Sequence, residues 1–200
     1  MTPRAPAMAP DERRAAIIAS TVPLLRDRGR AVSTKDIARA AGVAEGTIFR
    51  VFESKDELVD ACVHDAFQTE SLVVRLLDID DTLPLRERLA AAVSTMQDYL
   101  RGIFSLMSVL QATGRPMRRP HQGEDPRREA ANTAVDQAFV ALIGADAEQL
   151  RLPAMEVVNY LRMITLSSVH PMLHHQGSSA QELVDVILEG ALRRPEGGGN

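Results

Sequence analysis

The residues that could bind a charged partner are concentrated in one segment, residues 33–55, with the sequence STKDIARAAGVAEGTIFRVFESK. This segment contains both lysines of the chain, Lys35 and Lys55, which suit contacts with phosphate groups. The chain shows no Ser–His–Asp or Cys–His set, no paired carboxylates and no glycine-rich phosphate loop. The sequence therefore favours binding over catalysis, and we expect that the protein is not an enzyme.

Two short helices around a tight turn are predicted to position this segment. Ser33 can cap a helix that starts at Thr34 and ends near Ala41, with Asp36 returning a hydrogen bond to the cap. Gly42 can adopt the left-handed conformation that ends this helix. A second helix is expected from about Ala44. Such a pair is typical of a helix-turn-helix, whose second helix enters the major groove of DNA.

The segment from about Asp11 to Val63 resembles the DNA-binding domain of the tetracycline-repressor (TetR) family of bacterial transcriptional regulators. The resemblance implies an all-α fold, with an N-terminal three-helix helix-turn-helix domain followed by a helical domain for ligand binding and dimerisation. It rests on residues that occur in the right order and at the right spacing, namely Arg28, Gly29, Lys35-Asp36-Ile37-Ala38, Ala41-Gly42-Val43, Gly46-Thr47, Phe49, Phe52 and Ser54-Lys55-Asp56-Glu57-Leu58.

The resemblance also implies which residues contact DNA. The start of the helix-turn-helix and the start of the following helix grip phosphates in this family, which assigns Ser33, Thr34 and Lys55 to phosphate contacts. Lys35 is expected to face either a phosphate or a guanine edge. Base contacts are expected from the second helix, through residues that we call the recognition surface: Ala44, Glu45, Gly46, Thr47 and Arg50.

Individual side chains of the second helix suit particular partners. Glu45 can accept a hydrogen bond from a cytosine amine, and Thr47 can contact a thymine methyl group or a phosphate. Arg50 can bind phosphate or guanine, and the alternative for Glu45 and Arg50 is a solvated helix surface. Phe49 stands where the family usually has tyrosine, which leaves ring packing at the interface. Ala44 replaces a serine cap that is frequent in the family.

Charge is distributed unevenly along the chain, whose net charge is −4. Residues 1–55 hold ten Lys/Arg and six Asp/Glu, a net charge of +4, and residues 56–200 carry −8. The basic part suits DNA, and the acidic part discourages unspecific binding to it. The single cysteine, Cys62, cannot form an internal disulfide, and no apolar run approaches the ~20 residues that span a bilayer. We therefore expect a cytoplasmic protein.

Helices are predicted along the whole chain, which shows no strand pattern. Ser54 with Glu57, and Ser179 with Glu182, suit capping boxes. The expected helices cover residues 11–28, 34–41, 44–51, 55–77, 84–102, 103–112, 126–143, 153–170 and 180–192. The expected domains are a disordered Pro/Ala-rich arm at 1–10 (not a signal peptide), the helix-turn-helix domain at 11–53, a sensing and dimerisation domain at 54–193 with a mobile loop at 113–126, and a disordered tail at 194–200.

Specific recognition of DNA requires two copies of such a motif, ~34–36 Å apart, on a roughly palindromic site. The last two predicted helices carry broad apolar stripes that suit a four-helix packing between subunits. Their alternative role is the core of a monomer. The residues assigned to the dimer interface, the predicted dimer set, are Val157, Leu161, Ile164, Leu183, Ile187 and Leu188.

The middle helices are expected to hold a sensor for a small molecule. Large apolar side chains with a few polar groups suit a pocket between helices, although the same pattern is typical of ordinary core. No cluster of buried charge indicates an anionic ligand, so an apolar or amphipathic one is expected. The predicted pocket set is Met96, Tyr99, Leu100, Phe104, Met107, Gln111, Phe139, Tyr160 and Met163.

Three histidines, His170, His174 and His175, lie close together near the end of a predicted helix. Pro171 disturbs that helix, and no neighbouring carboxylate or cysteine completes a ligand set, so neither a metal nor a cofactor is expected. Cys62 is expected to be a small core residue.

Two functions follow from these observations. The first is a ligand-responsive repressor that binds a palindromic operator as a homodimer and is released by an apolar or amphipathic small molecule. The alternative is an all-helical small-molecule-binding protein or enzyme that keeps the helix-turn-helix only for packing. Lysines at both phosphate positions favour the first, because a packing relic would not need them.

Overall fold

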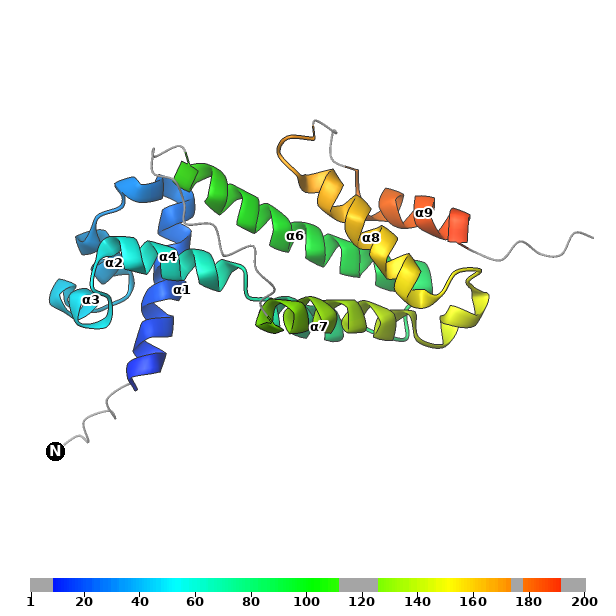
Figure 1. Ribbon diagram of the computed structural model, residues 1–200, viewed down its shortest axis with the longest axis horizontal. Helices are drawn as coiled ribbons and strands as arrows, with labels where there is room; N and C mark the ends of the chain where they lie inside the picture. The colour runs from blue at the N-terminus through cyan, green and yellow to red at the C-terminus, as the bar shows by residue number, and fades with distance from the viewer. Residues whose placement is uncertain (1–8, 112–125, 174–177, 192–200) are drawn as a thin grey trace, which may run out of the picture. The chain divides into compact units, whose positions relative to one another are not determined.

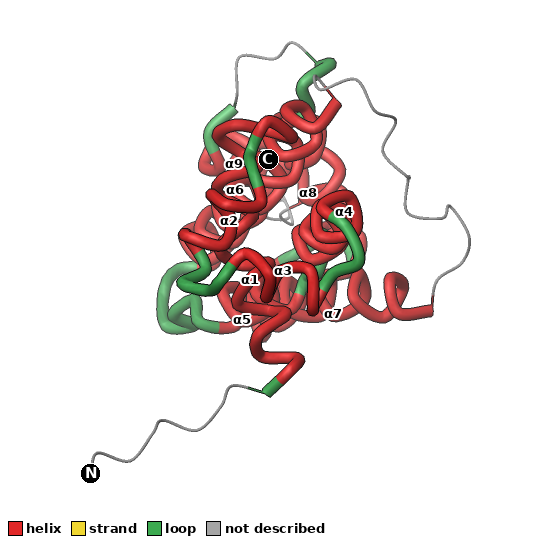
Figure 2. The backbone as a smooth tube through the Cα atoms, turned by 90° about the vertical axis from the view of Figure 1, so that its left-hand side faces the viewer, coloured by secondary structure: helices red, strands yellow, loops and turns green. Residues whose placement is uncertain are grey.

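A computed structural model describes residues 9–111, 126–173 and 178–191, apart from the side chains of Arg30, residues 126–128 and Ala191. The described residues form helices joined by loops and contain no strand, which confirms the predicted all-α fold (Figure 2). They divide into two compact units. The first unit comprises the residues up to Phe67 together with Ile103–Gln111, and the second comprises Gln68–Gly102 and the described residues from Pro126 onward. The arm at 1–8, the loop at 112–125, His174, His175 and the tail lie outside the described residues.

The first unit contains the helix-turn-helix (Figure 1). Its elements are α1 (Pro10–Arg28), η1 (Gly29–Ala31), α2 (Thr34–Ala40), α3 (Glu45–Val51), α4 (Lys55–Ala66) and the end of α6 (Leu85–Gln111). Each helix turns an apolar face toward one shared core, because its buried residues recur at helical spacing. The largest fully buried side chains of this core are Ile17, Leu25, Ile37, Ile48, Phe52, Leu58, Leu106 and Leu110.

The turn between α2 and α3 has the conformation predicted from Gly42. This glycine has a φ of +67°. The Val43 N–H donates to the Ala38 carbonyl at 2.9 Å, and the Gly42 N–H donates to the Arg39 carbonyl at 3.3 Å. These two bonds form a Schellman motif, which satisfies carbonyls at the end of α2 and aims the chain into α3.

The second unit contains α5 (Glu70–Leu77), the larger part of α6, α7 (Pro126–Ile143), η2 (Gly144–Gln149), α8 (Ala154–Val169) and α9 (Ala180–Ala191). Helix α7 packs against α5 and α8, and α8 packs against α9 (Figure 1). The capping box predicted at the start of α9 is present, because the Ser179 hydroxyl accepts from the Glu182 N–H at 3.2 Å and the Glu182 carboxylate accepts from the Ser179 N–H at 2.8 Å.

A buried arginine organises one end of the second unit. Arg88 donates to the carbonyls of Asp81 at 2.7 Å and Leu83 at 3.0 Å, in the loop between α5 and α6. It also forms an ion pair with Asp146 of η2. A charge can be buried when it is paired and hydrogen-bonded in this way.

Two predicted helix boundaries were wrong. The helix expected from residue 55 to 77 is interrupted at residues 67–69, so α4 and α5 are separate. Leu58 lies in the core of the first unit and Leu76 in that of the second. These two leucines are five helical turns apart in sequence, so their spacing cannot reveal the interruption. Conversely, α6 continues through Gly102, where a break was expected, because a glycine inside a helix costs only about 1 kcal/mol.

The hydropathy of the helices shows whether any of them could span a membrane. Within the described residues, no helix is both long and apolar enough to cross a membrane.

Candidate DNA-binding interface

Helix α3 exposes most of the recognition surface. Its Ile48 is fully buried in the core of the first unit, whereas Glu45, Gly46, Phe49 and Arg50 are exposed and Thr47 is half-buried. Ala44 is the N-cap of α3 and makes no side-chain hydrogen bond there. One helix face therefore anchors α3, and the opposite face is accessible to a partner.

Ser33 holds the start of α2. Its hydroxyl accepts from the Asp36 N–H at 3.1 Å and donates to the Asp36 carboxylate at 2.7 Å. The hydrogen bond from the Ser33 hydroxyl lowers the pKa of Asp36, with smaller contributions from the Ser33 N–H and from Arg39 and Arg28. Ser33 is thus the cap that the sequence predicted. The Asp36 carboxylate accepts a hydrogen bond mainly from the Ser33 hydroxyl, and less from the Ser33 N–H.

Thr34 and Glu45 form a direct bond between the two helices of the motif. The Thr34 hydroxyl donates to Oε1 of Glu45 at 2.5 Å. Thr34 is half-buried and Glu45 is exposed. The structure therefore joins a residue expected to contact phosphate to a residue expected to contact a base.

The two lysines lie at the starts of helices. Lys35 is exposed near the start of α2, and Lys55 is the first residue of α4. Ser54 caps α4 by accepting from the Glu57 N–H at 3.1 Å, as predicted. The second bond of the predicted capping box differs, because the Glu57 carboxylate accepts from the N–H of Glu53 at 2.6 Å, one residue before the cap. The cap fixes the backbone that carries Lys55.

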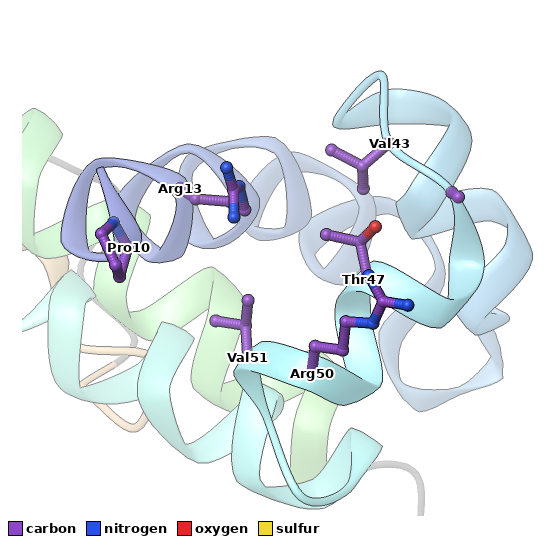
Figure 3. Close-up of a pocket in the computed structure, with 7 residues that line it drawn as sticks. Pro10, Arg13, Val43, Thr47, Arg50 and Val51 are labelled. Atoms are coloured by element: carbon purple, nitrogen blue, oxygen red, sulfur yellow. The ribbon is translucent and has the colours of Figure 1, made fainter. Parts of the chain in front are cut away.

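A groove of about 590 Å³ lies beside α3. It is lined on one side by Pro10 and Arg13 of α1 and on the other by residues of the turn and α3, including Thr47 and Arg50 (Figure 3). The side chain of Arg13 points into this space in the close-up (Figure 3). Sequence reasoning missed Pro10 and Arg13, because the helical period of α1 shows only its buried face and not what its exposed face meets.

The predicted pocket set is divided between the two units. Phe104, Met107 and Gln111 belong to the first unit, and the other six residues belong to the second. Within the second unit, Met96 and Phe139 are buried in the core, and Tyr99 and Leu100 are half-buried against it. Tyr160 and Met163 point outward instead, with exposed fractions of 48% and 67%.

The predicted dimer set faces mostly inward. Val157, Leu161 and Leu188 are buried in the core of the second unit, and Ile164, Leu183 and Ile187 are half-buried against it. Other apolar side chains of α8 and α9 are exposed. Met155 is exposed in the first turn of α8, and four further residues form what we call the outer face: Tyr160, Met163, Leu166 and Val186.

His170 and Cys62, the remaining residues singled out from the sequence, form hydrogen bonds with neighbouring backbone groups. His170 ends α8, and its Nδ1 accepts from the Met172 N–H at 3.3 Å. Cys62 is fully buried, and its thiol donates to the Ile18 carbonyl with a separation of 3.9 Å. Burial raises the pKa of the Cys62 thiol to about 12, with a smaller contribution from the charge of Asp65.

Comparison with known proteins agrees with this geometry. Residues 17–62 match the model of the family described as bacterial regulatory proteins, tetR family. A TetR transcriptional regulator from Streptomyces coelicolor is 25% identical, with a TM-score of 0.52 over 90% of this chain and 98% of that one.

Two further solved structures have the same fold. The ketosteroid transcriptional regulator KstR2 of Mycobacterium tuberculosis is 22% identical, with a TM-score of 0.51 over 96% of this chain and 100% of that one. Another tetR-family regulator from Streptomyces coelicolor is 24% identical, with a TM-score of 0.54 over 92% of this chain and 80% of that one. The family match covers the exposed α3 and its supporting helices, and the likeness in fold extends over nearly the whole chain, so the protein is a DNA-binding transcriptional regulator of the TetR family.

Proposed function

We propose that the protein is a cytoplasmic repressor that binds a palindromic operator as a homodimer and leaves it when a small molecule binds. The observation that carries this proposal is the exposed α3, which is anchored by Ile48 and lies between the two lysines along the chain. An α-helix fits the major groove of B-DNA, where base edges differ in their donors and acceptors. Lys35 and Lys55 supply positive charge for the phosphates on either side.

The groove beside α3 extends this interface. Arg13 and Arg50 lie on its two sides, so a phosphate group of the DNA backbone can approach two guanidinium groups there. Phosphate contacts of this kind fix the register of a protein on DNA without reading sequence. We therefore assign Arg13 to the interface together with the residues predicted from the sequence.

The outer face supports the homodimer. Tyr160, Met163 and Leu166 follow one another at three-residue spacing on α8, so they share a side of that helix, and Val186 is exposed on α9. Contiguous exposed apolar side chains of this size are typical of interaction surfaces. We propose that the outer face, together with the half-buried members of the predicted dimer set, packs against the same helices of a second copy.

The effector is proposed to bind inside the second unit. Met96, Tyr99 and Leu100 of α6 and Phe139 of α7 contribute flexible and aromatic side chains to the same core of the second unit. An apolar or amphipathic molecule suits this lining. Repression is relieved if the molecule prefers a dimer shape that fits DNA poorly, since a ligand shifts an equilibrium only by its difference in affinity between the two states.

Fluorescence anisotropy with DNA from upstream of the protein's own gene tests the proposal. Binding should survive an excess of unrelated DNA and should be lost in the Lys35→Ala, Lys55→Ala double variant. The matched control is Arg75→Ala, Arg101→Ala, which removes the same charge from the exposed surface of the second unit, where both arginines pair with Asp98. The control should bind as the parent does.

If the parent protein does not prefer the DNA upstream of its own gene, the next experiment is selection of binding sites from a random DNA library. An enriched palindrome would place the operator elsewhere and support the proposal. No enriched sequence would reject it in favour of a helix-turn-helix kept only for packing. Small molecules are then screened for release of the selected DNA.

A further inference from the structure

The hydrogen bond between Thr34 and Glu45 fixes the direction of a carboxylate on the recognition surface. The Thr34 hydroxyl donates to Oε1 of Glu45 at 2.5 Å, across the turn between α2 and α3. Glu45 is the first residue of α3, and the first residues of a recognition helix are those that meet base edges. A long, exposed side chain would otherwise sample several rotamers. The bond from Thr34 restricts it.

A threonine hydroxyl has a single proton to donate. Phosphate oxygens only accept hydrogen bonds, so Thr34 cannot serve a phosphate and Glu45 with its hydroxyl at the same time. Ser33 is committed in a similar way, because it donates to the Asp36 carboxylate at 2.7 Å. Both hydroxyls at the start of α2 are therefore occupied by carboxylates within the motif.

Oε2 of Glu45 is free of this bond and can accept from a donor in the major groove. Guanine presents two acceptors and thymine presents one acceptor and a methyl group, and acceptors repel a carboxylate. Adenine offers an amine, but its N7 acceptor lies beside it. The cytosine N4 amine has an acceptor on one side only, the O6 atom of its paired guanine, whereas the adenine amine lies between its own N7 and the O4 atom of its paired thymine. The charge of Glu45 thus favours cytosine over the other three bases.

We propose that Thr34 is a positioning residue that holds Glu45 to select cytosine at one position of each half-site. This inference rests on the proposed binding of α3 in the major groove. It gives the cytosine contact predicted for Glu45 a structural cause, and it removes the Thr34 hydroxyl from the phosphate contacts that the family resemblance implied.

The test is selection from a random double-stranded DNA library with the full-length protein and three variants. Thr34→Val removes the hydroxyl and keeps the shape, and Thr34→Ser keeps the hydroxyl. Glu45→Gln keeps the length and replaces the carboxylate with an amide, which pairs with N6 and N7 of adenine. Thermal unfolding of each variant shows that it is folded.

The parent protein should prefer cytosine at one position per half-site. Thr34→Val should weaken that preference about tenfold at this position alone, Thr34→Ser should retain it, and Glu45→Gln should shift it toward adenine. The inference is overturned if Thr34→Val weakens binding to all sequences equally, which would make Thr34 a phosphate contact. It is also overturned if Glu45→Gln changes no position, which would make Glu45 a solvated residue. A parent protein that enriches no sequence would instead reject the proposed function itself.

Discussion

The guanidinium carbon of Arg14 lies 4.3 Å from the centre of the Phe52 ring. The same guanidinium donates to the carbonyl of Val51, the last residue of α3, at 3.3 Å, and to the carboxylate of Glu57 in α4 at 3.5 Å. One side chain of α1 thus contacts both the end of the recognition helix and the start of the next helix. Arg14 therefore fixes where α3 ends in relation to α1.

Replacement of Arg14 by alanine should lower the free energy of unfolding by about 1 kcal/mol. A partly exposed cation–π contact and a partly exposed ion pair each contribute less than this, and the substitution removes both. Chemical denaturation measures the loss. Arg26→Ala, at an exposed position of the same helix, is the control and should have a smaller effect. Equal effects of the two substitutions would contradict the role given to Arg14.

The same chemical change, glycine to alanine, should have opposite effects at two positions of the motif. Gly42→Ala should destabilise the protein by about 1 kcal/mol, because an added Cβ disfavours the left-handed conformation. Gly46→Ala should stabilise it by up to about 1 kcal/mol, because Gly46 lies inside α3. At neither position does a Cβ meet a neighbouring atom, so backbone conformation alone decides the sign. Thermal unfolding of both variants checks this, and shifts of the same sign would contradict it.

Arg13 should contribute to DNA affinity without contributing to sequence preference. Arg13→Ala should weaken binding to specific and unrelated DNA alike and reduce the slope of log affinity against log salt by about 1. Arg101→Ala removes the same charge from the second unit and should leave the slope unchanged. Anisotropy titrations at several salt concentrations provide the measurement. A loss confined to one DNA sequence would show that Arg13 contacts a base.

A charge on the outer face should separate the subunits of the proposed homodimer. Val186→Glu, at a position that is 69% exposed, should shift the protein toward monomers, because a carboxylate in an apolar interface has no partner. Val74→Glu on α5, where the valine is 56% exposed, is the matched control and should remain dimeric. Sedimentation velocity distinguishes the two forms. Dimers of the Val186→Glu variant as stable as those of the parent would place the interface elsewhere.

The buried thiol of Cys62 should make stability depend on alkaline pH. Its pKa is raised from an ordinary value of 9.0 to about 12, so above pH 9 the unfolded chain loses the proton that the folded chain keeps. The contribution of the Cys62 thiol to the free energy of unfolding is therefore fully present below pH 9. It decreases by ~1.4 kcal/mol per pH unit between pH 9 and 12. Unfolding of the parent and of Cys62→Ala at pH 8 to 10.5 isolates this contribution. Parallel pH profiles would contradict it.

Local features of the motif could be predicted from the sequence because they depend on neighbouring residues. Ser33 and Ser54 as caps, and Gly42 as the left-handed residue, follow from the conformations that these side chains favour. The bond from Thr34 to Glu45 could not be predicted. It joins residues eleven positions apart, and each had a plausible DNA contact of its own.

The outward sides of α8 and α9 show a second limit. A broad apolar stripe predicts that a helix is covered, but it does not say which residues face the core of the same chain. Leu161 and Leu188 proved to be core, whereas Met163 and Val186 are exposed. The sequence period is the same for both sets, so only the packing of the helices separates them.

The position of Arg88 affects how the second unit tolerates mutation. The loop between α5 and α6 has backbone carbonyls, those of Asp81 and Leu83, that are satisfied by a side chain outside the loop. Carbonyl groups are present whatever side chain a loop residue carries. A saturation-mutagenesis map should therefore show that most substitutions are tolerated in the loop and few at Arg88. The residue that stabilises the loop thus lies outside it, several positions further along the chain.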